Sequence, residues 1–319
     1  MPRIEGVTLA PNWTSAAGAL EGILEFFDAA LPRHAIMGLT GHAWHFCLAT
    51  REGVTALPSG ATDLDWDAMT ARYALTGYLW SRFAGPATEE GREAAIAWAT
   101  PHLDAGRPLI GWDFHLHEHA IIDGYDRARA GFLVQDILTE EVGPFVPWNA
   151  WPGLGHIELF APIAPVEVDP AEAVASALET ALLCFEGGDG PEDGRPRGTA
   201  GIEAWADALD GEGEVDRAGN AYTLVVLQAA RADGAAFLAD LAESIPPLAE
   251  PLVKAKTAID EQVKALSPLI TLFPFPTGGH GNVNVPGLRR AAAMALRRAA
   301  QHERTAAAHI REALTLFEE

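Results

Sequence analysis

Three histidines in one short segment are the side chains of this chain best suited to chemistry. His115, His117 and His119 alternate with other residues, and Asp113 and Ile121 continue the same spacing on either side. Because successive side chains of a strand point to opposite faces, this alternation predicts that the five residues share one face. Imidazole exchanges protons near neutral pH and is the commonest metal ligand in proteins. The segment therefore predicts a site of proton transfer or of metal binding.

The same alternation allows a metal site. His115, His117 and His119 could supply ligands to a divalent cation such as zinc, and Asp113 could add a carboxylate. Residues of a strand rise by about 3.3 Å each, so one ion reaches only two neighbouring histidines of the row. Candidates for a further ligand elsewhere in the chain are His42, His45 and His280.

Helices and strands of the first half of the chain must position this segment. Apolar residues at spacings of three and four predict helices at 15–30, 65–83 and 89–103. The apolar runs at 108–112, 117–125, 131–138 and 156–162 indicate strands. A helix-rich beginning followed by a group of strands is typical of an α+β fold.

The second half of the chain is rich in alanine and almost wholly helical. Asp169 and Pro170 suit a helix start, because proline is tolerated at the first helical position. After a polar loop at 187–198, further helices are predicted at 199–210, 216–231, 233–244, 247–266 and 286–317. We expect a boundary between Pro162 and Pro170, with one domain at 1–164 and an all-helical domain at 165–319.

A hairpin of two predicted strands brings His119 close to a carboxylate. If the hairpin turns between Arg127 and Ala128, His119 lies directly opposite Asp136. Directly opposed residues share a face, with Cβ atoms within about 5.5 Å of each other. The expected register therefore pairs an imidazole with an acid that could orient it.

Several phrases of the sequence resemble a known family. The strand His119-Ala-Ile-Ile-Asp-Gly-Tyr-Asp126 and the following Gly131-Phe-Leu-Val-Gln-Asp136 resemble strands of bacterial papain-like proteins, including the peptidases that trim double-glycine leader peptides. Further phrases are similar to the family of butirosin biosynthesis protein H, whose N-terminal domain is papain-like: Met37-Gly-Leu-Thr-Gly41, Gly106-Arg-Pro-Leu-Ile-Gly-Trp-Asp113, residues 118–126, Gly201-Ile-Glu-Ala-Trp205 and Arg231-Ala-Asp-Gly-Ala-Ala-Phe-Leu238. This resemblance implies a papain-like domain at 1–164.

The resemblance also implies an activity, namely acyl transfer or the handling of an amide bond in small-molecule metabolism. Ser15 begins Ser15-Ala-Ala-Gly-Ala-Leu20, where the leader peptidases have a cysteine nucleophile at the start of a helix. In the implied arrangement, Asp136 orients His119, and His119 acts as base for Ser15 or for an amine of the substrate. Expected substrate-binding residues are Asn12, Trp13, His45, Asp113, His117, Glu118 and His280.

Two other functions stay open at this point. Since a serine stands where the related peptidases have cysteine, the chain could be a pseudoenzyme that binds a ligand without turnover. The row of histidines could instead serve a metal-dependent enzyme, although the main expectation is that no cofactor is needed. The expected partner is a small molecule or an acyl carrier, and a homo-oligomer is left open.

Charge and cysteine content narrow the partners and the compartment. The formal net charge of -22 argues against nucleic acid and against anionic membrane surfaces, because both are bound through exposed Lys and Arg. The sequence contains no run of about eighteen apolar residues, so it predicts no membrane span. The first residues lack the apolar core of a signal peptide. Cys47 and Cys184 lie far apart in the sequence and are expected to be reduced, so we expect a cytoplasmic protein.

Overall fold

One antiparallel sheet organises the first of two units of this chain. The computed structural model describes residues 3–48, 50–51, 54–55, 64–153, 155–191 and 193–318. Unit 1 consists of Met1–Ile36 and Asp67–Val168, and unit 2 of Met37–Trp66 and Asp169–Glu319. The chain passes from unit 1 to unit 2 for the last time after Val168, inside the predicted boundary region. Residues 37–66 belong to the largely helical unit, which the sequence did not indicate.

Within the described residues, the sheet of unit 1 has the strand order β3-β8-β4-β5-β6-β7, and every neighbouring pair is antiparallel. This mixture of an antiparallel sheet and helices confirms the α+β class. The strands are β3 (Tyr78–Pro86), β4 (Leu109–Trp112), β5 (His119–Asp126), β6 (Gly131–Gln135), β7 (Phe145–Pro147) and β8 (His156–Pro165). A separate pair of short strands, β1 (Thr50–Arg51) and β2 (Val54–Thr55), lies in unit 2.

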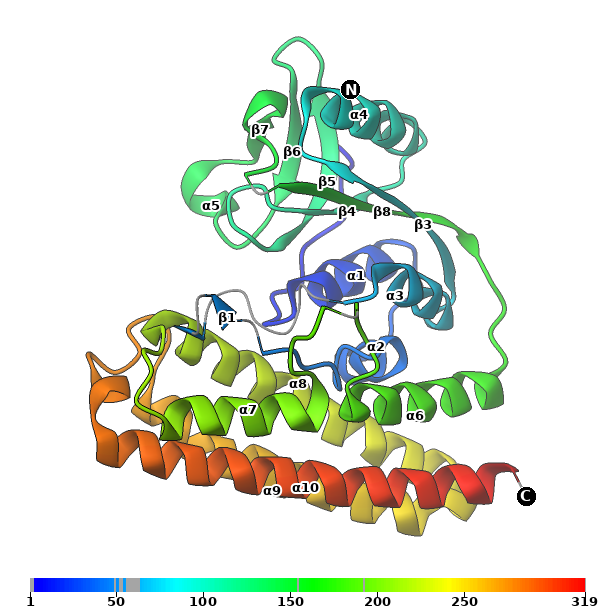
Figure 1. Cartoon of the computed structure of the whole chain (residues 1–319). Coiled ribbons are helices and arrows are strands. Elements are labelled where there is room, and N and C mark those ends of the chain that lie inside the picture. Colours follow the sequence, from blue (N-terminus) through cyan, green and yellow to red (C-terminus); the bar gives the residue numbers. More distant parts are fainter. Residues whose placement is uncertain are drawn as a thin grey trace. The chain divides into compact units, whose positions relative to one another are not determined.

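Helices cover both faces of the sheet (Figure 1). On β5, Ile121 faces α1 (Ser15–Phe26), whereas Ile122 joins the apolar core with Ala95 and Ala99 of α4 (Glu89–Asp104). Adjacent strand residues point to opposite faces, so α1 and α4 lie on opposite sides of β5. His119 has the same parity as Ile121, which places its side chain on the α1 face.

Helix α1 follows the predicted apolar pattern but is shorter than expected. Its residues Ala16, Ala19, Leu20, Ile23 and Leu24 are buried, and the helix ends at Phe26 rather than near residue 30. The N-terminal segment 3–12 runs closely along it. A Cβ atom added at Gly18 or Gly22 would come within 2.2 Å or 2.0 Å of a backbone oxygen of that segment. Glycine therefore permits this close approach.

The predicted helix at 65–83 is wrong in its second half. Helix α3 (Trp66–Tyr73) ends in a single 3-10 turn, and Gly77 then adopts a φ of +90°. Residues after Gly77 form β3, which pairs with β8 along its whole length. Left-handed glycine ends the helix, and the aromatic residues that follow suit a strand covered by a neighbour better than an exposed helix.

Unit 2 is built mainly from long helices, whose bounds are α6 (Pro170–Glu186), α7 (Gly198–Asp210), α8 (Arg217–Ser244), α9 (Ala249–Leu272) and α10 (Pro286–Glu318). Two shorter helices complete the described set: α2 (Arg33–Thr40), which crosses the division between the units, and α5 (Thr139–Val142) in unit 1. Asp169 caps α6, as predicted, by accepting hydrogen bonds from two backbone N–H groups of its first turn. A break was expected near residue 232, but α8 is continuous. Gly234 lies inside it against the ring of Trp44, where a side chain would collide.

A buried ion pair holds the helices of unit 2 together. Arg231 donates to Glu303 at 2.8 Å, and Gln262 and Thr199 donate to the same carboxylate at 2.7 Å and 3.0 Å. Arg231 also donates to the backbone oxygen of Ala43 at 2.6 Å. The network joins α7, α8, α9 and α10 to the segment after α2.

Among the described residues, no helix has the length and apolar character needed to cross a membrane.

Candidate functional site

The chemically promising segment is a turn rather than a strand. Strand β4 ends at Trp112 and β5 begins at His119, and these two residues are paired. The six residues between them form a turn closed by the Asp113 N–H, which donates to the backbone oxygen of Glu118 at 3.0 Å. Asp113 itself has a φ of +67°, a left-handed conformation that aspartate tolerates better than most residues. The expected row of residues on one strand face is therefore wrong.

Two histidines of this β4–β5 turn (residues 113–118) are each held by a buried carboxylate. His115 Nδ1 lies 2.8 Å from Asp136 Oδ2, and His117 Nδ1 lies 2.6 Å from Asp113 Oδ1. Both aspartate side chains are almost fully buried, whereas the His117 side chain is 58% exposed. Because a carboxylate accepts the Nδ1–H, each ring keeps Nε2 as its second proton-exchange position.

The turn also separates the three histidines that the metal alternative names. His115 and His117 bind separate aspartates, and His119 belongs to β5. Throughout the part of the chain that the structure describes, no group of three or more His, Cys, Asp or Glu side chains is arranged to hold a metal ion. The metal alternative therefore finds no group of ligands among the described residues, and it stays a prediction.

Ser15 meets the β4–β5 turn at the start of α1. Its Oγ–H donates to Glu118 Oε2 at 2.5 Å, and the backbone N–H of His119 donates to Ser15 Oγ at 3.0 Å. Thr14 occupies the N-cap position, but its side chain makes no capping hydrogen bond. The backbone N–H of Thr14 donates to Asn12 Oδ1 at 2.9 Å. The structure thus brings Ser15, Glu118 and the backbone of His119 together at one helix N-terminus.

The imidazole of His119 is buried on the α1 face of the sheet. Its ring lies 4.9 Å from the ring of Trp112 and 6.3 Å from that of Phe160, measured between centroids. Burial, together with the smaller effect of the nearby His156, lowers the pKa of His119 to about 3. A group that remains neutral to such low pH is a weak proton acceptor. The environment of His119 does not suit the general base that the resemblance implied.

The hairpin register differs from the expected one. Gln135 pairs with Ile121 and Gly131 with Asp126, with a bulge between Ile122 and Gly124. The turn between β5 and β6 spans residues 127–130. As a result, Asp136, which follows Gln135, lies one position away from the place opposite His119. Asp136 consequently binds His115, and the predicted His119–Asp136 pair is wrong. A one-residue shift reverses the face of every side chain, which explains the size of the effect.

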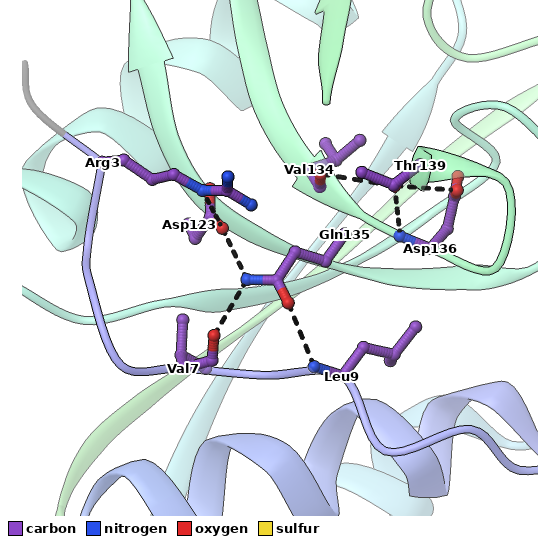
Figure 2. A network of polar contacts seen from close by, with 8 residues as sticks. All are labelled: Arg3, Val7, Leu9, Asp123, Val134, Gln135, Asp136 and Thr139. Carbon is purple, nitrogen blue, oxygen red and sulfur yellow. Dashed lines mark hydrogen bonds and ion pairs between the residues drawn. The ribbon is translucent and has the colours of Figure 1, made fainter. Parts of the chain in front are cut away.

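Gln135 is a positioning residue that sequence reasoning missed. Figure 2 shows its amide between the N-terminal segment and β5: it donates to Val7 O at 3.0 Å and to Asp123 Oδ2 at 2.6 Å, and accepts from Leu9 N–H at 3.1 Å. Arg3 also donates to Asp123 at 2.7 Å. These contacts hold the segment that leads into α1. The signal available in the sequence was a polar residue, Gln135, at a strand position expected to face the interior.

Asp136 is fixed by its own short turn, also drawn in Figure 2. Its backbone N–H donates to Thr139 Oγ1 at 2.8 Å, and its carboxylate accepts from Thr139 Oγ1 at 3.1 Å. The carboxylate also accepts from Leu138 N–H at 2.9 Å. The carboxylate that holds His115 is therefore itself held rigidly.

The remaining predicted site residues divide between the two units. Trp13 is exposed next to the start of α1 in unit 1. His45 belongs to unit 2, where its Nδ1 lies 3.3 Å from Asp189 Oδ2. His280 is an exposed residue of unit 2 with a φ of +51°, between glycines. The structure therefore gives His45 and His280 settings of their own.

The chain matches no protein-family model, and no curated protein matches its sequence. Its chemistry is consequently inferred from the geometry: a serine hydrogen-bonded to a carboxylate at a helix N-terminus, beside a turn that carries two aspartate-held imidazoles.

Proposed function

We propose that this chain is an acyl-transfer or amide-bond-handling enzyme of small-molecule metabolism, with Ser15 as nucleophile and Glu118 as its base. The observation that carries the proposal is the 2.5 Å hydrogen bond from Ser15 Oγ to Glu118 Oε2. A general base must reach the proton that it removes, and Glu118 is already in contact with that proton. The carboxylate takes the part that the resemblance assigned to the imidazole of His119.

The position of Ser15 supports the same chemistry. Ser15 is the first residue of α1, where backbone N–H groups without helical partners and the helix dipole favour negative charge. An oxyanion that forms when Ser15 attacks a carbonyl would lie near this end of the helix. The His119 N–H donates to Ser15 Oγ and so helps to fix the orientation of the Ser15 hydroxyl.

A papain-like scaffold is part of the proposal. In that fold, a nucleophile at the start of a buried helix packs against an antiparallel sheet, and α1 lies against β4 and β5 in this way. The family phrases around 106–113 and 118–126 fall on β4, on the β4–β5 turn and on β5. We propose the family of butirosin biosynthesis protein H on these two grounds, with a small molecule or an acyl carrier as substrate.

Hydrolysis of p-nitrophenyl acetate by the purified full chain tests the proposal. We expect Ser15→Ala and Glu118→Gln each to lower kcat/KM by about 100-fold or more, as loss of a nucleophile or base does. Ser267→Ala, which removes an exposed hydroxyl of α9, is the matched control and should leave the rate unchanged. Mass spectrometry of the wild type should find the acetyl group on the peptide that contains Ser15. Equal rates in wild type and Ser15→Ala would refute the proposal.

A second candidate is a non-catalytic ligand-binding protein of the same fold. The observation that favours it is the burial of His119, which leaves Ser15 without an imidazole base. Ser15→Cys separates the two functions, because a thiol ionises far more readily than a hydroxyl. An enzyme should gain or lose turnover with this change, whereas a binding protein should show no turnover in either form.

A further inference from the structure

A second hydrogen-bonded pair lies beside Ser15 and Glu118 in the β4–β5 turn. His117 Nδ1 lies 2.6 Å from Asp113 Oδ1, and the aspartate side chain is 3% exposed while the histidine is 58% exposed. A buried acid that binds one ring nitrogen fixes the orientation and tautomer of the ring. The Nε2 atom of His117 is then the nitrogen that a substrate can reach.

The two pairs are parts of one rigid turn. His117 directly precedes Glu118 in the sequence, and consecutive Cα atoms are about 3.8 Å apart. The Asp113 N–H donates to the backbone oxygen of Glu118 at 3.0 Å, which closes the turn on itself. Glu118 in turn binds Ser15. The residue that holds His117 is thus hydrogen-bonded to the residue that holds the nucleophile.

We propose that His117, oriented by Asp113, is the catalytic residue that exchanges protons with the leaving group and with the acyl acceptor. This inference rests on the proposed function. It adds a second proton carrier, so that Glu118 can keep the proton of Ser15 while the leaving group takes its proton from His117. Glu118 therefore exchanges the proton of the nucleophile, and His117 exchanges the proton of the leaving group.

The proton balance of the reaction is complete with these residues. In acylation, Ser15 Oγ bonds to the carbonyl carbon and its proton passes to Glu118; the bond to the leaving amine or alcohol breaks as that group takes a proton from the His117 imidazolium. In deacylation, the acceptor amine or water bonds to the carbonyl carbon and gives a proton to His117 Nε2. The bond to Ser15 Oγ then breaks, and Ser15 regains its proton from Glu118.

The other histidines of the segment are less suited to this part. His119 is buried among aromatic rings of unit 1. The His115 side chain is only 15% exposed, and its carboxylate partner Asp136 is shared with the turn at 136–139. Among these three residues, only His117 combines a largely exposed imidazole with a hydrogen bond to a buried aspartate.

Two substrates with different leaving groups test the assignment on the full chain. Nitrophenolate leaves p-nitrophenyl acetate without a proton, whereas 4-nitroacetanilide requires one. We expect His117→Gln to lower kcat/KM for the anilide by about 100-fold, with kcat/KM for the ester unchanged. For the ester, kcat and KM should fall together because deacylation slows, and the acetyl-enzyme should accumulate. His309→Gln, which removes a partly exposed histidine paired with Glu312 in α10, is the matched control.

The outcomes separate the inference from the function on which it rests. Equal losses on both substrates in His117→Gln would indicate a structural role and overturn the inference, while Ser15 and Glu118 stayed essential. A wild type that turns over the ester no faster than Ser15→Ala would overturn the proposed function, and the inference with it. Asp113→Asn should reproduce the anilide defect in part, because it acts through His117.

A measurement without substrate checks the orientation of the ring. Nitrogen NMR of imidazole-labelled protein distinguishes the two tautomers of a neutral histidine. We expect neutral His117 to carry its proton on Nδ1, and Asp113→Asn to relax this preference. A proton found on Nε2 of neutral His117 would overturn the inference whatever the kinetics show.

Discussion

Replacement of His119 by phenylalanine should remove a specific part of the pH dependence of stability. The pKa of His119 falls to about 3 in the folded chain, mainly because the ring is buried. In the unfolded chain the same group titrates near 6.5. Below that pH the unfolded state binds a proton that the folded state does not. The free energy of unfolding therefore decreases as pH falls from the unfolded value toward the folded one.

The size of this loss follows from the two pKa values. At about pH 7.5 the histidine is neutral in both states, so it contributes almost nothing to the pH dependence. About pH 4.5 lies two pH units below the unfolded pKa and still above the folded one, and each unit corresponds to 1.36 kcal/mol. His119 should therefore cost the wild type about 3 kcal/mol of stability between these two pH values.

Urea unfolding followed by tryptophan fluorescence at both pH values measures this quantity. Phenylalanine keeps a ring against Trp112 and Phe160 but cannot take up a proton. The wild type should lose about 3 kcal/mol more than His119→Phe on acidification, since all other titrating groups are common to the two proteins. His309→Gln, altered at a partly exposed histidine far from His119 in the sequence, should behave like the wild type. The same pH dependence in wild type and His119→Phe would refute the burial argument.

Two further predictions address the buried ion pair and the N-terminal contact. Arg231→Met should lower the free energy of unfolding by about 3–5 kcal/mol in urea titrations, because it leaves Glu303 buried without its counter-ion; Arg304→Ala, at an exposed ion pair, should cost less than about 1 kcal/mol. Gly22→Ala should cost about 1–3 kcal/mol in thermal unfolding, because the added Cβ would come within 2.0 Å of a backbone oxygen, and an unchanged Tm would contradict that contact.

Local sequence patterns predicted most of the helices and strands. The apolar spacing of α1, the Asp-Pro start of α6 and the strand runs of β4, β5, β6 and β8 all correspond to observed elements. These features depend on residues close in sequence, so they can be read without knowledge of the fold. The errors occurred where a distant partner decides. Residues 78–86 became a strand because β8 is available to pair with them, and α8 continues through Gly234 because that glycine accommodates Trp44.

The amino-acid sequence alone determined that histidines and acids are concentrated between Trp112 and Asp126 and that a serine begins the first helix. Tertiary structure alone decided which of them meet. A six-residue turn and a one-residue bulge paired His115 with Asp136, His117 with Asp113 and Ser15 with Glu118. Such pairings depend on backbone direction and strand register, and a shift of one residue sends a side chain to the opposite face. Spacing in the sequence specifies the available chemistry, but not the partners that make it work.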